Sequence, residues 1–128
     1  MSADVTACFD PNFAEVFDGK NVSRINCGVA MCKYTGHGGK VATNDASAEL
    51  VAFIRRIMAK GEVVWQAGDM GKNDLGGGGT VAKYISKHNI PTVDMGVPVI
   101  AMHSPFEIVS KADVYTAHKA FAAFYTLD

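Results

Sequence analysis

The sequence predicts an α/β fold of three layers, with a mostly parallel or mixed β-sheet and helices on both faces. Short apolar runs of strand length alternate along the chain with longer segments of helical periodicity. Such alternation is typical of strands joined by crossover helices. The length of 128 residues is that of one domain. The content of 48% hydrophobic and 20% charged residues is ordinary for a globular protein. A single domain over residues 1–128 is therefore expected.

Apolar runs bounded by turn residues mark the expected strands. These strands cover residues 2–9, 28–34, 62–66, 90–94 and 97–102. In the first of them, Val5, Ala7 and Phe9 would share the apolar face, because side chains alternate along a strand. Pro98 has no N–H for a sheet ladder, so we expect it at the first position of the last strand. Residues 13–22 show no clear period, and residues 35–39 are expected to break the second strand.

The helix predicted over residues 46–60 has the clearest periodicity. Its apolar residues recur at helical spacing and comprise Leu50, Phe53, Ile54, Ile57 and Met58. Asn44-Asp45 offers an N-cap, and Gly61 is expected to end the helix. A second helix would follow Thr80 as its cap. A third would follow Ser110-Lys-Ala-Asp113, which resembles a capping box with Asp in place of Glu.

The composition argues against several classes of partner. The formal net charge of -1 gives no reason to expect binding to nucleic acid or to an anionic membrane. No apolar run approaches the roughly 20 residues that span a bilayer, and no signal peptide is recognisable. Cys8, Cys27 and Cys32 form no C-x-x-C pair, and we interpret them as reduced, buried thiols of a cytoplasmic protein.

Two possible metal ligands stand beside predicted strands. His103 follows the apolar run 97–102 and precedes Ser104-Pro105, so it is expected at the C-terminal lip of a buried strand, where α/β sheets bind ligands. Asp4 belongs to the first predicted strand, and adjacent strand ends could bring the two together. Two ligands are too few for a zinc site. From spacing alone, a histidine satisfied by backbone at a strand end is the more frequent case.

A glycine run, Gly76-Gly-Gly-Gly79, precedes Thr80 and the second predicted helix. It lacks the lysine of a P-loop and the distant acidic residue of a dinucleotide-binding fingerprint. We interpret it as a close backbone approach to a substrate or to a neighbouring strand. Lys33, at the end of another strand, could bind a carboxylate, although a lysine with its tip in water is more frequent there.

The remaining histidines, His37, His88 and His118, have no visible partners and are expected to be exposed or half-buried. Neither a G-x-S-x-G nucleophile elbow nor the surroundings of an activated cysteine occurs in the sequence.

A series of short motifs runs in order along nearly the whole chain. The motifs are Ser2-Ala-Asp-Val5 with Asp10-Pro-Asn-Phe13, Gly28-Val-Ala-Met-Cys-Lys-Tyr-Thr-Gly36, Asn44-Asp-Ala46, Gly71-Lys-Asn-Asp-Leu-Gly-Gly-Gly-Gly-Thr80, and Met102-His-Ser-Pro-Phe-Glu107 with Ser110-Lys-Ala-Asp113. Together they resemble the C-terminal segment of the catalytic domain of the aspartyl/vacuolar aminopeptidase family, in its bacterial branch. These enzymes are dinuclear zinc exopeptidases that act on peptides.

The resemblance implies roles for individual residues. Asp4 would ligate one zinc ion and His103 the other, while Lys33 would approach the substrate. The interpretation of the glycine run adds Gly78 and Gly79 as expected substrate-binding residues. The position of a substrate-contacting histidine in aspartyl aminopeptidases is Ala7 here, which argues against a preference for acidic N-terminal residues.

The resemblance also implies what the chain lacks. The family's other zinc ligands, its glutamate general base and its dimerisation domain would lie upstream, so no catalytic residue is expected in this chain. A truncated, inactive part of a zinc aminopeptidase, homo-oligomeric at full length, is therefore the expected identity. A non-catalytic module serving packing or self-assembly is the alternative, and a nucleotide-binding protein would rest on the glycine run alone. Zinc, cobalt and manganese all suit mixed oxygen and nitrogen ligands.

Overall fold

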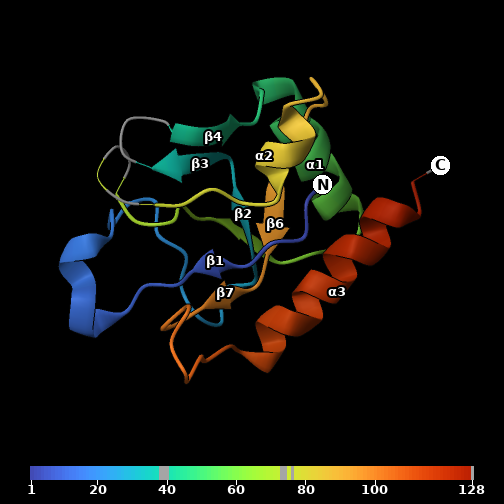
Figure 1. Ribbon diagram of the computed structural model, residues 1–128. Helices are drawn as coiled ribbons and strands as arrows, with labels where there is room; N and C mark the ends of the chain where they lie inside the picture. Colours follow the sequence, from blue (N-terminus) through green and yellow to red (C-terminus); the bar gives the residue numbers. More distant parts are fainter. Residues whose placement is uncertain (38–40, 73–74, 76, 128) are drawn as a thin grey trace.

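The computed structural model describes residues 1–37, 41–72, 75 and 77–127 (Figure 1). The elements follow in the order β1 (Thr6–Ala7), a 3-10 helix η1 (Pro11–Val16), β2 (Val29–Cys32), β3 (Tyr34–His37), β4 (Val41–Asp45), α1 (Ala48–Lys60), β5 (Trp65–Ala67), α2 (Ala82–Ser86), β6 (Asp94–Gly96), β7 (Pro98–Val99) and α3 (Lys111–Tyr125). Strands and helices thus alternate over much of the chain.

The centre of the molecule is a mixed sheet around β2. Strand β2 pairs in parallel with β5 and antiparallel with β6, while β1 pairs in parallel with β7. The segment before β1 continues this pairing, because the Ser2 N–H donates to Val93 O and the Met95 N–H donates to Ser2 O. Residues 2–8 therefore run beside both β6 and β7, and the expectation of a mixed sheet is confirmed.

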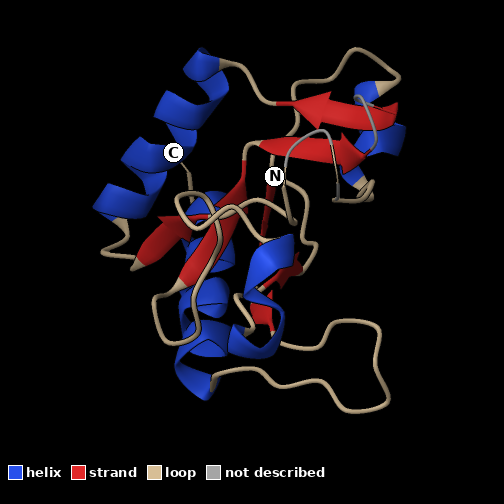
Figure 2. Cartoon of the chain, turned by 90° about the vertical axis from the view of Figure 1, so that its left-hand side faces the viewer, coloured by secondary structure: helices blue, strands red, loops and turns tan. Residues whose placement is uncertain are grey.

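Some strand limits differ from those predicted. The strand expected at 90–94 was mostly wrong, because β6 shares only Asp94 with it. The strand expected at 97–102 is shortened to β7, with Pro98 at its first position as expected, so His103 lies in a turn beyond the strand rather than at its end. The break expected at 35–39 was wrong, because β3 and β4 form an antiparallel pair that takes in Thr35 and Asn44. In Figures 1 and 2 this pair lies beside the central strands, near the start of α1.

The hydrophobic core fills one face of the sheet. Val29 and Met31 of β2 and Met95 of β6 pack against α1 and α3 in a single cluster. Helix α1 contributes Ile54, Ile57 and Met58, all buried, as its periodicity predicted. Its cap is Ser47, whose Oγ accepts from the Leu50 N–H at 3.2 Å, because Asn44-Asp45 is used by β4. Gly61 ends the helix as expected.

The opposite face of the sheet is more polar. Because side chains alternate along a strand, Asp94 points away from Met95 and from the core. Its carboxylate accepts a hydrogen bond from Thr80, which comes just before α2. Helix α2 also contacts β4 through a hydrogen bond between Ser86 Oγ and Asn44 Oδ1. In Figures 1 and 2, α1 and α2 lie on opposite sides of the central strands, which makes three layers.

The first strand presents a different face from the one predicted. Thr6 and Cys8 are buried, whereas Val5 is 42% exposed. The reason is a close crossing at Gly96, where a Cβ atom would lie only 1.8 Å from the Asp4 carbonyl oxygen. Since Gly96 carries no side chain, Thr6 comes within reach of Cys32, whose thiol lies 3.0 Å from Thr6 Oγ1.

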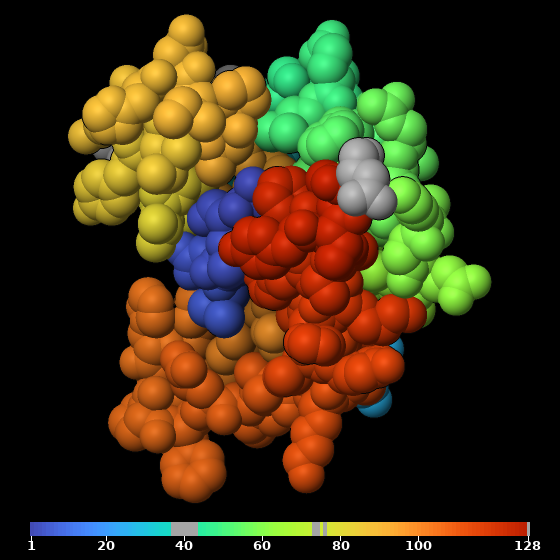
Figure 3. All heavy atoms as spheres, turned by 90° about the vertical axis from the view of Figure 1, so that its right-hand side faces the viewer, coloured from blue at the N-terminus to red at the C-terminus, as the bar shows by residue number. Residues whose placement is uncertain are grey.

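Helix α3 lies over the middle of the face of the molecule seen in Figure 3, with the N-terminal segment beside it. Ser110 caps it by accepting from the Ala112 N–H at 3.2 Å. The capping box expected from Asp113 was wrong. The Asp113 carboxylate instead accepts the Asn26 and Gly28 N–H groups, each at 2.8 Å, and so ties the start of α3 to the loop before β2.

All three cysteines are free. Cys8 and Cys32 are buried as expected, but Cys27 is exposed, because it lies in the loop before β2 rather than in the strand. Burial raises the pKa of the Cys8 thiol and raises that of Cys32 to about 12. His88 and His118 are exposed as expected, while the side chain of His37 lies outside the described part. No helix in the described part is both long and apolar enough to cross a membrane.

A candidate metal centre in a cleft beside the sheet

A cleft of about 450 Å³ opens on the polar side of the molecule. One wall is the N-terminal segment with Asp4, and another is the loop after β7 with His103. The glycine run contributes Gly77, Gly78 and Gly79, and the end of η1 adds apolar contacts. Four of the five residues that the sequence pointed to, Asp4, His103, Gly78 and Gly79, therefore line one cavity, although the two possible metal ligands are far apart in the sequence.

Asp4 is held by both its backbone and its side chain. Its backbone passes directly over Gly96, and its Oδ2 atom accepts a hydrogen bond from the Val81 N–H at 3.1 Å. The other oxygen, Oδ1, accepts no hydrogen bond recorded in the described part of the chain. One oxygen is thus fixed by the backbone just before α2, which leaves the other available for a ligand in the cleft.

His103 lies in a loop whose base is closed by an isolated antiparallel bridge between Ile100 and Ile108. Ile100 and Ile108 exchange backbone hydrogen bonds of 2.9 and 3.2 Å on either side of it. The backbone of His103 is left-handed, with φ of 70°, and its N–H donates to Glu107 Oε1 at 2.6 Å. Non-glycine residues in this conformation cost energy and often occur at functional sites. His103 is exposed and lines the cleft.

The glycine run is explained by two different requirements. Gly77 has φ of +87°, and a Cβ atom there would lie 2.5 Å from the Gly36 carbonyl oxygen. The Gly36 N–H also donates to Gly78 O at 3.0 Å, so the run packs against β3. At Gly78, by contrast, a Cβ atom would meet nothing within 4 Å. Gly77 approaches a neighbouring strand, which is one of the two interpretations made from the sequence. Gly78 faces open space, which leaves room for the substrate of the other interpretation. Gly76 lies outside the described residues.

A buried carboxylate, that of Asp94, is hydrogen-bonded to Thr80, which lines the cleft. Asp94 is 2% exposed, and its Oδ2 accepts from Thr80 Oγ1 at 2.6 Å. Its Oδ1 is buried without a hydrogen bond to any described residue. Burial raises the pKa of Asp94, because desolvation outweighs the stabilising effect of the nearby Thr80 and Ser2 hydroxyl groups. The sequence carried no local signal for this residue.

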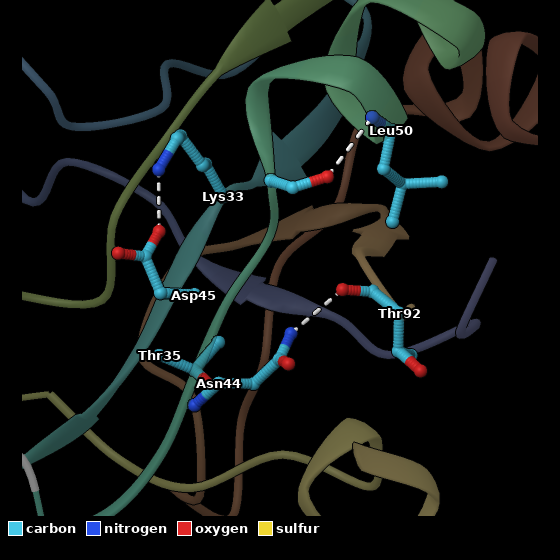
Figure 4. A network of polar contacts seen from close by, with 7 residues as sticks. Lys33, Thr35, Asn44, Asp45, Leu50 and Thr92 are labelled. Atoms are coloured by element: carbon cyan, nitrogen blue, oxygen red, sulfur yellow. Dashed lines mark hydrogen bonds and ion pairs between the residues drawn. The ribbon is translucent and has the colours of Figure 1, made fainter. Parts of the chain in front are cut away.

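Lys33 lies outside the cleft. Its Nζ forms an ion pair with Asp45 (Figure 4), and both side chains are about half exposed. It lines a separate cavity of about 400 Å³ together with Arg55 and Trp65. The structure therefore does not bring Lys33 to the residues around Asp4 and His103.

The chemistry of the cleft fits zinc in kind. Carboxylate and imidazole are both zinc ligands, and a catalytic zinc ion takes three protein ligands and keeps one open position. Within residues 1–37, 41–72, 75 and 77–127, no group of three or more His, Cys, Asp or Glu side chains is placed to hold one ion. Asp4 and His103 can therefore supply part of a zinc coordination shell, and further ligands are needed to complete it.

Known proteins match the chain over nearly all of its length. It is 50% identical over 125 residues to the probable M18 family aminopeptidase 1 of Borrelia garinii subsp. bavariensis, which is 98% of this chain and 27% of that protein. It is 45% identical over 121 residues to the corresponding protein of Thermotoga maritima, or 94% of this chain and 27% of that one. The chain thus spans 27% of the length of these curated relatives.

Solved structures agree with the sequence matches. The crystal structure of aminopeptidase I from Clostridium acetobutylicum superimposes with a TM-score of 0.91 at 42% identity, over 98% of this chain and 28% of that one. The M18 aminopeptidase of Thermotoga maritima gives a TM-score of 0.90 at 44% identity, over 95% of this chain and 27% of that one. The family described as Aminopeptidase I zinc metalloprotease (M18) matches residues 1–125. The chain therefore belongs to the M18 family of zinc metalloproteases.

Proposed function

We propose that residues 1–128 are one structural unit, the C-terminal part of the catalytic domain of a zinc aminopeptidase that removes N-terminal residues from peptides. In this proposal Asp4 and His103 each ligate one of two zinc ions. The observation that carries it is the shared cleft, which Asp4, His103 and the glycine run all line. The chain's 27% coverage of its relatives agrees with a coordination shell completed by residues from elsewhere.

In this proposal each residue of the cleft has a separate role. When bound, zinc polarises a carbonyl group and makes a coordinated water more acidic. Asp4 would bind the metal through the oxygen that the Val81 N–H leaves unused. His103 would approach from the opposite wall, fixed by its left-handed backbone and by Glu107. The open space at Gly78 would let a peptide backbone come close to the loop. The general base is assigned to no residue of this chain.

A chimera tests the proposal most sharply. The matching 125-residue segment of the Borrelia relative is replaced by this chain, and hydrolysis of aminoacyl-p-nitroanilides is measured with zinc content. We expect zinc-dependent hydrolysis that Asp4→Asn or His103→Gln nearly abolishes, each with loss of one zinc ion. The matched controls Glu49→Gln and His118→Gln, both on exposed helix positions, should leave zinc content and rate unchanged.

Several outcomes would contradict the proposal. Full activity and zinc content in Asp4→Asn or His103→Gln would remove that residue from the metal site. A chimera that folds but binds no zinc would favour the alternative, a non-catalytic module for packing or self-assembly. That alternative has one observation in its favour, namely the incomplete ligand set among the described residues.

The remaining roles implied by the family are part of the same proposal. Lys33 lines a different cavity, so its contact with substrate stays a prediction. Lys33→Met in the chimera should raise KM if that contact exists. We further propose a homo-oligomeric full-length protein in the cytoplasm, which gel filtration and cell fractionation would test.

A further inference from the structure

Asp94 occupies a costly position that the proposed metal ligands do not explain. It lies in β6 opposite Cys32 of β2, and its other neighbour across the sheet is Ser2. It is 2% exposed. A carboxylate buried in the middle of a sheet is unfavourable unless other groups compensate it. Only one of its two oxygens accepts a hydrogen bond from the described residues, so its burial costs the fold stability.

The one hydrogen bond leads to the cleft. Thr80 Oγ1 donates to Asp94 Oδ2 at 2.6 Å, and the N–H of the next residue, Val81, donates to Asp4 Oδ2 at 3.1 Å. Residues 80 and 81 are therefore held between two carboxylates, one inside the sheet and one at the cleft. Thr80 itself lines the cleft, whereas Asp94 is not among the lining residues. The hydrogen bond to Thr80 is therefore the contact by which Asp94 reaches the lining of the cleft.

The segment before Thr80 makes such an anchor necessary. Gly77, Gly78 and Gly79 precede it directly, and glycines leave the backbone the widest choice of conformations. The five-residue helix α2 that follows has no side-chain cap, so it cannot fix its own start. A hydrogen bond from Thr80 to a central strand supplies the fixed point.

We propose that Asp94 is a positioning residue for the cleft, which fixes Thr80 and thereby sets the Val81 N–H that orients the Asp4 carboxylate. The inference rests on the proposed function only where it calls Asp4 a metal ligand. The coupling of Asp94 to Asp4 through Thr80 and Val81 stands on the hydrogen bonds alone.

Hydrogen exchange in the 128-residue chain tests the coupling without any metal. Amide exchange of Val81 is measured by NMR in Asp94→Ala and Thr80→Val, and in the conservative variants Asp94→Asn and Thr80→Ser. In Asp94→Ala and Thr80→Val we expect the Val81 amide to exchange about tenfold faster, relative to the Met95 amide, because one hydrogen bond is lost. The conservative variants, which keep an acceptor or a donor, should stay within about twofold.

The comparison among variants separates positioning from general stability. Normalising to Met95, whose N–H is bonded to Ser2 O, removes the effect of global unfolding. If Asp94→Ala fails to fold, Thr80→Val carries the test. Unchanged Val81 exchange in Thr80→Val, or equal effects of Thr80→Ser and Thr80→Val, would overturn the proposal.

The same variants are then made in the chimera, where zinc affinity measures their effect on the site. Asp94→Ala and Thr80→Val should each lower zinc affinity by about 10- to 100-fold, the range for residues that orient metal ligands. The double variant should be no weaker than either single variant, because both act on one path. Asp94→Asn and Thr80→Ser should retain most of the affinity. Additive losses would overturn the proposal.

The two proposals fail in different ways. If Asp4→Asn leaves zinc content intact, the metal role of Asp4 is wrong, while Val81 exchange still decides the role of Asp94. If Asp94→Ala leaves Val81 exchange unchanged, the positioning role is wrong whatever zinc does at Asp4.

Discussion

Asp94 and Asp113 are almost equally buried, at 2% and 1% exposure, yet the protein uses them differently. Both oxygens of Asp113 accept backbone N–H groups and join α3 to the loop before β2. Asp94 has one oxygen bonded to Thr80 and one without a partner in the described part of the chain. A fully paired buried carboxylate stabilises its surroundings, whereas a half-paired one lowers stability. The difference separates a region built for the fold from one that supports the cleft.

Removing the carboxylate of Asp113 should give the largest loss of stability. Asp113→Ala leaves the Asn26 and Gly28 N–H groups without their acceptors, which we expect to cost about 2 to 6 kcal/mol at roughly 1–3 kcal/mol per group. Urea unfolding measures it. Asp94→Ala should cost clearly less, because only one hydrogen bond is lost. Equal losses of stability in Asp113→Ala and Asp94→Ala would show that the full and the half pairing of the carboxylates do not differ in their effect on the fold.

A methyl group at Gly96 should be nearly as damaging and should act on the cleft. Its Cβ would lie 1.8 Å from Asp4 O, so the N-terminal segment must move, at a cost of about 1–3 kcal/mol. Gly28→Ala is the matched control beside Asp113, whose carboxylate accepts the Gly28 N–H, with φ of +93° and a Cβ 2.4 Å from Val64 O.

Both glycine variants should lower the urea midpoint. Only Gly96→Ala should change the NMR shift of the Val81 amide, which is bonded to Asp4. A shift at Val81 in Gly28→Ala as well would show that the two regions are not separable.

Stability should depend on pH through Asp94. Because its folded pKa lies above the unfolded value near 3.8, the folded state binds the proton more tightly than the unfolded chain does. The contribution of this carboxyl is therefore complete below pH 3.8 and is lost as the pH rises through the folded pKa. Asp94→Asn removes that loss and keeps an acceptor for Thr80.

We expect the urea midpoint of Asp94→Asn, relative to the unmodified protein, to be higher at pH 7 than at pH 4. Glu49→Gln, an exposed carboxyl, controls for changes in overall charge. A difference that is constant with pH would show that burial of Asp94 carries no electrostatic cost.

The smallest effect on stability should come from Gly78→Ala. A Cβ atom there meets nothing within 4 Å, so the urea midpoint should hardly move, with less than about 0.5 kcal/mol of change. In the chimera the same methyl group should raise KM if substrate passes close to the loop. Gly77→Ala, with its Cβ 2.5 Å from Gly36 O, should instead lower stability. An unchanged KM in Gly78→Ala would leave the open space without a function.

Local patterns predicted the core side of the fold well. The buried residues Ile54, Ile57 and Met58 follow from helical spacing, and Gly61 ends α1 as expected. These features depend on residues close in the sequence. Asp113 had the spacing of a capping box, but its acceptor role depends on a loop far away in the chain, and no local pattern records that.

The cleft side was predictable only in part. The types of Asp4 and His103 and their places beside strands indicated ligands, and the glycine run indicated a close backbone approach at Gly78 and Gly79. The buried faces of the first strand were missed, because the crossing over Gly96 is a contact between distant segments. Asp94 could not be singled out from the sequence, since an aspartate at the end of a predicted strand is usually exposed, and its burial depends on neighbours far away in the chain.

The paired isoleucines at the base of the His103 loop have a consequence for variation and design. Ile100 and Ile108 close the loop by two backbone hydrogen bonds, while Phe106 near its tip is 86% exposed. Lengthening a closed loop adds little entropy cost, about 0.6 kcal/mol for each doubling. Because backbone groups hold the two ends of the loop together, the exposed Phe106 side chain can be exchanged for others while the Ile100–Ile108 bridge keeps the loop closed.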